Sequence, residues 1–216
     1  HHPVPESHTR HCRFRFSLRT LLVVMALLGV LLGVLGSMAY EARRQRRMVT
    51  RLNPSYVGIE RSGRLPDVLD TTYCSRVVGL SIWNAEFSDA SSLVQLNNLA
   101  ELSLEGTQVE NLSSLSSLDN LCELWLNDTP VADLSVLSGL TSLRKVGLEQ
   151  SNVCDVSPLS SLPKLEHIYL ADSPIADVSP LAKVKTLTFV DLRRTQVSDE
   201  QVNKLRQALP NCQILR

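Results

Sequence analysis

The chain has 216 residues, and although its 22 basic and 22 acidic side chains cancel, they are unevenly distributed. Residues 1–76 hold 12 Arg against five acids (+7), and residues 77–216 hold 10 basic against 17 acidic side chains (−7). This split excludes a uniformly basic nucleic-acid binder, the 44% hydrophobic content excludes a wholly disordered chain, and five Cys are too sparse for a small disulfide scaffold.

Residues 1–19 are predicted to be a disordered basic tail, because four Arg and four His stand there without any apolar periodicity. The imidazoles and the thiol of this tail could bind a transition metal adventitiously, but no sequence pattern orders them. We therefore assign no metal role to His1, His2, His8, His11 and Cys12, and we expect no cofactor.

Residues 20–40 contain 21 consecutive uncharged residues. As a helix this segment would span roughly 31 Å, the thickness of a bilayer core. Arg19 precedes it and an Arg-rich stretch follows from Arg43, which would hold both ends at the lipid headgroups. The sequence thus predicts one transmembrane helix that anchors the chain in the lipid bilayer of the cell membrane.

The alternative to an anchor is a cleaved signal peptide, which would release a secreted or structural solenoid after Ala39. Ser37-Met38-Ala39 resembles a cleavage site, but the apolar run is longer than the about 7–15 residues usual in signal peptides. Membrane orientation is undecided, since four Arg before the span face five after it.

Small residues recur on one face of the predicted span. The Gly29-x-x-x-Gly33 spacing would let two helix backbones approach closely, which predicts a homodimer through the membrane helix, although glycine is common in such helices anyway. The packing residues of this prediction are Ala26, Gly29, Gly33 and Ser37.

Residues 41–78 are interpreted as a juxtamembrane connector and the N-terminal cap of the following domain. An Arg-rich start is followed by turn signals, with a strand expected at 56–60 and a short helix near 65–69. A repeat domain needs an atypical first unit, because its end would otherwise expose core residues.

Residues 79–216 repeat with a period of 22 residues. Two apolar columns carry the period: Leu80, Leu102, Leu124, Val146, Ile168, Val190 and Cys212, and Ile82, Leu104, Leu126, Leu148, Leu170, Leu192 and Ile214. Apolar residues two apart predict a strand with one face inward, so the units are expected to stack as parallel strands in about six to seven repeats.

Two polar columns have structural interpretations. The hydroxyls of Thr107, Thr129, Ser151, Ser173 and Thr195 are placed to bond backbone groups where the chain turns. Asp89, Asn111, Asp133, Asp155, Asp177 and Asp199 are expected to cap a short helical return segment, whose first position twice holds Pro. The Asp column lacks the Gly-rich nonapeptide of calcium-binding β-rolls, which favours capping over a metal site.

The repeat resembles the 22-residue class of leucine-rich repeats, similar to bacterial internalins and to the protein phosphatase 1 regulatory subunit type; the stretches DVSPLSSLPKL and DVSPLAKVKTL carry the resemblance best. The resemblance covers residues 79–216 and implies an α/β fold: a right-handed solenoid with a parallel concave sheet and short helical or 3-10 convex segments. It also implies a non-enzymatic protein-binding module, often exported, which favours an extracytoplasmic solenoid. Unlike surface internalins, the chain shows no wall-sorting motif and has the N-terminal apolar span instead.

The expected binding surface is the concave sheet, which the residues flanking each Leu pair would line. Four of the five aromatic residues of the repeats fall there, and exposed aromatic residues are enriched in protein interfaces, although they could merely cover the sheet. The predicted partner-binding residues are Trp83, Glu101, Glu105, Glu123, Trp125, Glu149, His167, Tyr169, Phe189 and Arg193.

Trp125 and Tyr169 are expected to form the centre of this surface, on either side of a shallow slot above Gly147. The surrounding glutamates would repel phosphate, so the sequence favours a protein or peptide ligand with a basic patch over nucleic acid. His167 lacks a nucleophile or acid partner in the sequence pattern, so no enzymatic role is predicted.

Overall fold

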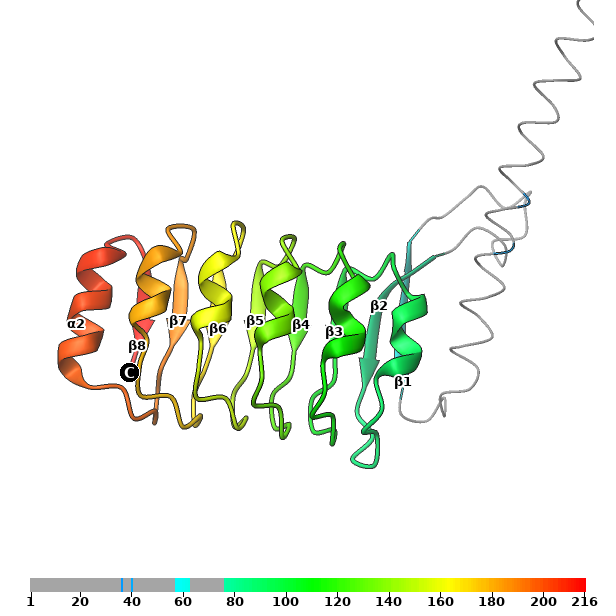
Figure 1. Ribbon diagram of the computed structural model, residues 1–216, viewed down its shortest axis with the longest axis horizontal. Helices are drawn as coiled ribbons and strands as arrows, with labels where there is room; N and C mark the ends of the chain where they lie inside the picture. Colours follow the sequence, from blue (N-terminus) through cyan, green and yellow to red (C-terminus); the bar gives the residue numbers. More distant parts are fainter. Residues whose placement is uncertain (1–35, 37–39, 41–56, 63–75) are drawn as a thin grey trace, which may run out of the picture. The chain divides into compact units, whose positions relative to one another are not determined.

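The computed structural model describes residues 36, 40, 57–62 and 76–216 (Figure 1). The chain divides into two compact units, residues 1–40 and 41–216, and the second holds the whole described sheet. No helix among the described residues is long and apolar enough to cross a membrane. The predicted tail 1–19, nearly all of the span 20–40 and the helix near 65–69 lie outside the described residues.

The described strands form one sheet in the order of the sequence (Figure 1). β1 (Val57–Ser62), close to the strand expected at 56–60, pairs antiparallel with β2 (Arg76–Ile82) and occupies the end of the sheet. Parallel pairing then runs through β3 (Glu101–Ser103), β4 (Glu123–Trp125), β5 (Lys145–Gly147), β6 (His167–Tyr169), β7 (Phe189–Asp191) and β8 (Gln213–Leu215).

The register of β2 to β7 confirms the predicted period. Leu80, Leu102, Leu124, Val146, Ile168 and Val190 are successive partners, each 22 residues after the last. These side chains, and those of the second apolar column from Ile82 to Leu192, are at most 2% exposed. Alternation along each strand therefore divides the residues into an inner set and an outer set, as the sequence predicts.

The last unit departs from the period, and here the prediction was wrong. Val190 pairs with Ile214, a step of 24 residues, so Cys212 precedes the strand instead of occupying the inward column. The return segment of this unit is the ten-residue helix α2 (Asp199–Ala208), twice as long as its counterparts, and it uses the extra residues. Gln213 and Leu215 are thus the outward residues of β8, and Asn211 lies in the turn before it.

The other units return through five-residue 3-10 helices, which Figure 1 shows on one side of the sheet together with α2. They are η2 (Ser91–Gln95), η3 (Ser113–Ser117), η4 (Ser135–Gly139), η5 (Ser157–Ser161) and η6 (Ser179–Lys183). As predicted, a carboxylate or amide oxygen two residues earlier accepts the first helical N–H, as from Ser135 to Asp133 at 2.8 Å. Asp199 is the exception, because Ser198 caps α2. Pro158, expected at the first position, is the second residue of η5.

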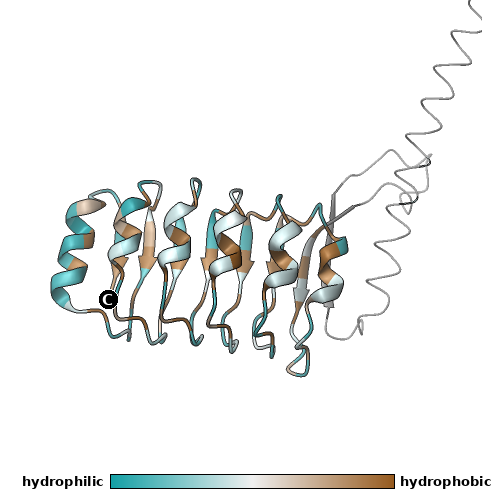
Figure 2. Ribbon diagram, viewed as in Figure 1, coloured by the Kyte–Doolittle hydropathy of each residue, from teal (hydrophilic) through white to brown (hydrophobic). Residues whose placement is uncertain are grey.

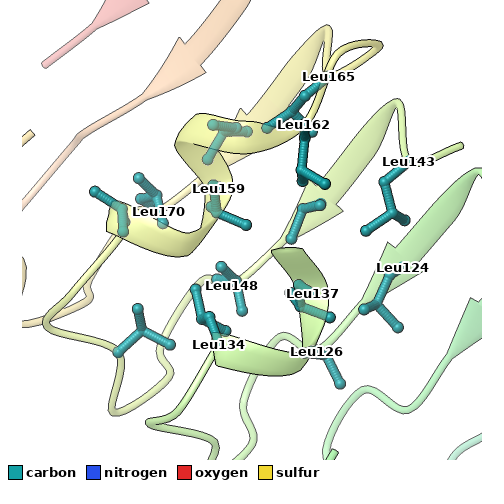
Figure 3. Close-up of a cluster of buried hydrophobic side chains, with 14 of the residues drawn as sticks. Leu124, Leu126, Leu134, Leu137, Leu143, Leu148, Leu159, Leu162, Leu165 and Leu170 are labelled. Carbon is teal, nitrogen blue, oxygen red and sulfur yellow. The ribbon is translucent and has the colours of Figure 1, made fainter. Parts of the chain in front are cut away.

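The core lies between the strands and these helices. Leu residues from both layers interdigitate there, as Figure 3 shows for Leu124, Leu137 and Leu159. Figure 2 shows the same division by hydropathy: α2 is largely hydrophilic, and the strands carry hydrophobic residues. Each unit buries its apolar side chains against its neighbours, so no unit forms a core alone.

The predicted hydroxyl column is confirmed: each side chain donates a hydrogen bond to the backbone carbonyl three residues earlier. Thr107 donates to Leu104 at 2.7 Å and Thr129 to Leu126 at 2.6 Å, and both side chains are buried. The residue directly before each hydroxyl-bearing residue has a positive φ, which the sequence analysis did not predict. These residues are Gly106, Asp128, Gln150, Asp172 and Arg194, with φ of 52° to 66°. The tight turn requires this conformation, which only Gly106 indicated.

Candidate binding surface on the open face of the sheet

The open face is the side of the sheet opposite the 3-10 helices and α2, and its outward residues form three columns across β2 to β7. The pairing places Glu101, Glu123, Trp125, His167, Tyr169 and Phe189 in the outward strand positions, and the predicted residues Trp83, Glu105, Glu149 and Arg193 follow their strands in the turns. The predicted membrane-helix packing residues Ala26, Gly29, Gly33 and Ser37 lie outside the described residues. One column runs from Gly79 to Phe189, the middle column from Ser81 to Asp191, and the last, in the turns that follow the strands, from Trp83 to Arg193.

Four rings of the open face form one continuous group, which we call the aromatic cluster: Trp125, His167, Tyr169 and Phe189. The ring centroids of Trp125 and Tyr169 lie 5.3 Å apart, and those of Tyr169 and Phe189 lie 5.2 Å apart. His167 stacks against both Tyr169 and Phe189, at 6.4 and 6.0 Å. All four side chains are partly exposed. The cluster is therefore a preformed apolar surface spread over β4, β6 and β7.

Gly147 is the reason that rings two strands apart meet. A Cβ built on Gly147 would lie 2.5 Å from Cε3 of Trp125 and 2.8 Å from Oδ1 of Asn127. The indole thus lies across the glycine and reaches Tyr169. The predicted slot above Gly147 is consequently wrong, because the ring of Trp125 fills it and leaves Gly147 buried.

Trp83 is the predicted aromatic residue that stands apart from the aromatic cluster. It lies at the end of β2, is 53% exposed, and has no ring contact among the described residues. Phe87 packs against the core, as its column predicts. The open face therefore has one isolated ring near β2 and one connected group from β4 to β7.

Two cations neutralise acids on the open face, and the sequence analysis missed both pairs. Lys145 Nζ lies 2.8 Å from Glu123 Oε1 on the neighbouring strand. Arg193 binds Asp191 with Nε and Nη2, the shortest distance being 2.6 Å. Asp191 is only 1% exposed, although its position predicts a solvent-facing residue. Parallel register places Glu123 beside Lys145, so the first pair could have been read from the repeat.

Burial raises the pKa of Asp191, but the hydrogen bonds from the side chain and backbone N–H of Arg193, together with its charge, outweigh burial and hold that pKa below its ordinary value. Arg193 is thus engaged in supporting a buried carboxylate at the end of the aromatic cluster. Its guanidinium remains exposed while it does so.

Three predicted acids of the open face have no cation paired with them among the described residues. Glu105 accepts a hydrogen bond from Asn127 at 2.7 Å, while the carboxylates of Glu101 and Glu149 have no side-chain partner in that part of the chain. Burial, followed by the negative charge of Asp191, raises the pKa of Glu149. The open face therefore keeps uncompensated negative charge beside its aromatic cluster.

Away from the open face, the described residues offer little chemistry. They contain no group of three His, Cys, Asp or Glu side chains placed to hold a metal ion. Cys122, Cys154 and Cys212 are free thiols, and burial raises the pKa of Cys212. A shallow hollow beside the strand starts is lined by Arg144 and Glu166, but the two side chains pair with each other at 2.7 Å.

No protein-family model matches the chain, and no curated protein matches it. Among solved structures it is similar to an internalin (inlF) from Listeria monocytogenes str. 4b F2365, with a TM-score of 0.58 and 22% identity over 67% of this chain. It spans about half, 51%, of that internalin. It is also similar to a leucine-rich-repeat protein from Leptospira interrogans, with a TM-score of 0.59 and 22% identity over 63% of this chain and 36% of that protein.

A third similar structure is a TLR13–ssRNA13 complex, with a TM-score of 0.53 and 17% identity over 64% of this chain and 21% of that protein. At these identities the likeness shows the fold alone. The chain therefore has a leucine-rich-repeat fold of the kind found in bacterial internalins.

Proposed function

We propose that this chain is a non-enzymatic binding protein, anchored in a membrane by residues 20–40, that holds a protein or peptide partner on the open face of its sheet. The observation that carries the proposal is the aromatic cluster, whose four partly exposed rings contact one another on a face that the described helices do not cover. Clustered aromatic residues on a rigid surface are typical of binding hot spots.

The charge of the open face supports a protein partner over a nucleic acid. Within the described part of the chain Glu101, Glu105 and Glu149 have no paired cation, so this surface is expected to repel phosphate and attract basic groups. The TLR13–ssRNA13 complex shows that a protein with this fold can be found with RNA, so the fold itself does not decide the partner. The distribution of charge on this face is what favours a peptide or protein.

Site-specific photo-crosslinking tests the surface in the full chain. A photoreactive residue at Ser103, on the open face beside Trp125, should capture a partner protein from the source cells. The control is the same residue at exposed Ser117 in η3, on the opposite side of the sheet. Equal products from both positions, or products from Ser117 alone, would contradict the proposed surface.

Anchoring and release have different mature N-termini, and mass spectrometry distinguishes them. An anchored protein keeps residues 20–40 and remains in the membrane fraction, in agreement with a single-pass protein whose repeats we propose to be extracytoplasmic. A chain that begins at Tyr40 would instead indicate the released solenoid. A membrane-helix homodimer through Gly29 and Gly33 would be lost when both are replaced by Ile.

A further inference from the structure

Glu149 stands out on the open face because its side chain is partly buried and has no ion-pair partner among the described residues. The other partly or fully buried acids of this face are matched, Glu123 by Lys145 at 2.8 Å and Asp191 by Arg193 at 2.6 Å. The Glu149 backbone N–H donates to Asn127 Oδ1 at 3.0 Å, which holds the residue in place, while its carboxylate accepts no hydrogen bond from the described residues.

The ring of Trp125, which contacts Tyr169 at 5.3 Å, reaches the neighbourhood of Glu149 through Asn127. Trp125 Cε3 and Asn127 Oδ1 lie 2.5 and 2.8 Å from the same point, the Cβ position of Gly147, and that Asn127 oxygen accepts the Glu149 backbone N–H at 3.0 Å. The indole N–H and the phenol O–H have no hydrogen-bond partner among the described residues. Two contacting aromatic rings with unpaired polar ends therefore share this part of the open face with one unpaired carboxylate.

From this geometry we infer that Glu149, Trp125 and Tyr169 form a site for a cationic side chain of the partner, with a guanidinium fitting best. In this site the Glu149 carboxylate accepts the hydrogen bonds of the guanidinium, and the flat face of the guanidinium rests against the aromatic rings. The inference rests on the proposed function and names the chemistry that the partner must bring to the open face.

The surrounding charges agree with this assignment. Glu105, Asp172 and Asp191 all add negative potential at Glu149, and Arg193, the nearby cation, is already bound to Asp191 through two nitrogen atoms. Burial and the neighbouring carboxylates raise the pKa of Glu149 although the charge of Arg193 lowers it, and a bound cation would stabilise the ionised form further. An arginine of the partner would thus complete the pairing pattern of this face.

Tryptophan fluorescence tests the site directly, because the chain contains two Trp and Trp83→Phe leaves Trp125 as the single reporter. The full chain carrying Trp83→Phe is titrated with the acetylated, amidated peptide Gly-Leu-Gly-Arg-Gly-Leu-Gly. The matched peptide has citrulline, which keeps the shape of arginine without its charge. We expect saturable change with the arginine peptide and binding at least about tenfold weaker with the citrulline peptide.

Two variants separate the site from general attraction to an acidic surface. Glu149→Gln, which keeps the shape of the side chain, should weaken binding of the arginine peptide about tenfold. Glu110→Gln removes the same charge from an exposed acid beside η3, on the helix side of the sheet, and should change binding less than about twofold. Equal effects of the two variants, equal binding of the two peptides, or no binding would overturn the inference.

A displayed peptide library, selected on the full chain, distinguishes failure of the cationic site from failure of the proposed function. Selected peptides rich in Arg that lose binding with Glu149→Gln support the site. Uncharged apolar peptides that depend on Trp125 but not on Glu149 would overturn the cationic site and leave the binding surface standing. Peptides that depend on neither residue would contradict both.

Discussion

The two sides of the same strands follow different rules. The inner columns repeat Leu, Ile or Val in every unit and are at most 2% exposed from β2 to β7, whereas the outer columns change from unit to unit, from Ser81 and Ser103 to Trp125, Gly147 and Tyr169. Stacked units must present the same shape to their neighbours, which constrains the inner side. The outer side is free of that constraint, so its variation is where recognition can be encoded.

The largest expected effect lies on the inner side. Leu126→Ala removes a side chain that is fully buried between two neighbouring units and should lower the free energy of unfolding by about 2–5 kcal/mol. Its matched control is the outward Ser103→Ala, which should change stability by less than about 0.5 kcal/mol. Denaturant unfolding followed by circular dichroism measures both, and equal effects would show that inner and outer sides are not distinct.

Gly147→Ala tests an outward position at which packing, here against the ring of Trp125, leaves no room for a side chain. The added methyl group meets the indole of Trp125, so the ring must move, and we expect a loss of about 1–3 kcal/mol with a shift in tryptophan emission. Gly139→Ala in η4 is the control, since a Cβ there meets nothing within 4 Å and should be neutral or slightly stabilising. Unchanged stability and emission in Gly147→Ala would contradict the described ring position.

The smallest predicted effect concerns how the ionisation of Glu149, on the open face, changes stability. Because the pKa of Glu149 is raised in the folded chain, the folded state holds its proton more tightly than the unfolded state. The stability contribution of this group therefore falls as pH rises from its unfolded to its folded pKa, and the ionised form opposes folding at neutral pH. Glu149→Gln should thus unfold at the same or a slightly higher temperature at pH 7, and a clear decrease would mean that the carboxylate stabilises the fold.

Much of the fold could be predicted because period two and period 22 leave one arrangement of inward residues for β2 to β7. The register of the last unit was mispredicted, because Cys212 and Ile214 are both apolar and fit the 22-residue spacing. A better indication was available: Ser198 caps a helix that buries Val202 and Leu205, three residues apart, which is an α-helical spacing rather than a five-residue turn.

The composition of the open face could also be predicted, but its contacts could not. Alternation along the strand places Trp125 outward, yet the direction in which its ring leans depends on the missing side chain at Gly147. The same holds for Arg193, which the sequence offers as a free partner-binding cation and the structure commits to Asp191. Side-chain rotamers and pair choices are set by neighbours from several units, which a single repeat does not reveal.

The most direct test of the central claim, that the aromatic cluster on the open face binds the partner, is the dissociation constant of a partner or selected peptide for two truncations. Trp125→Ala removes the ring that joins β4 to Tyr169, and Val94→Ala removes a 45% exposed side chain of η2, away from the open face. The account predicts a loss of about 2 kcal/mol or more, roughly 30-fold, for Trp125→Ala and almost none for Val94→Ala. Equal affinities of the folded variants would contradict it.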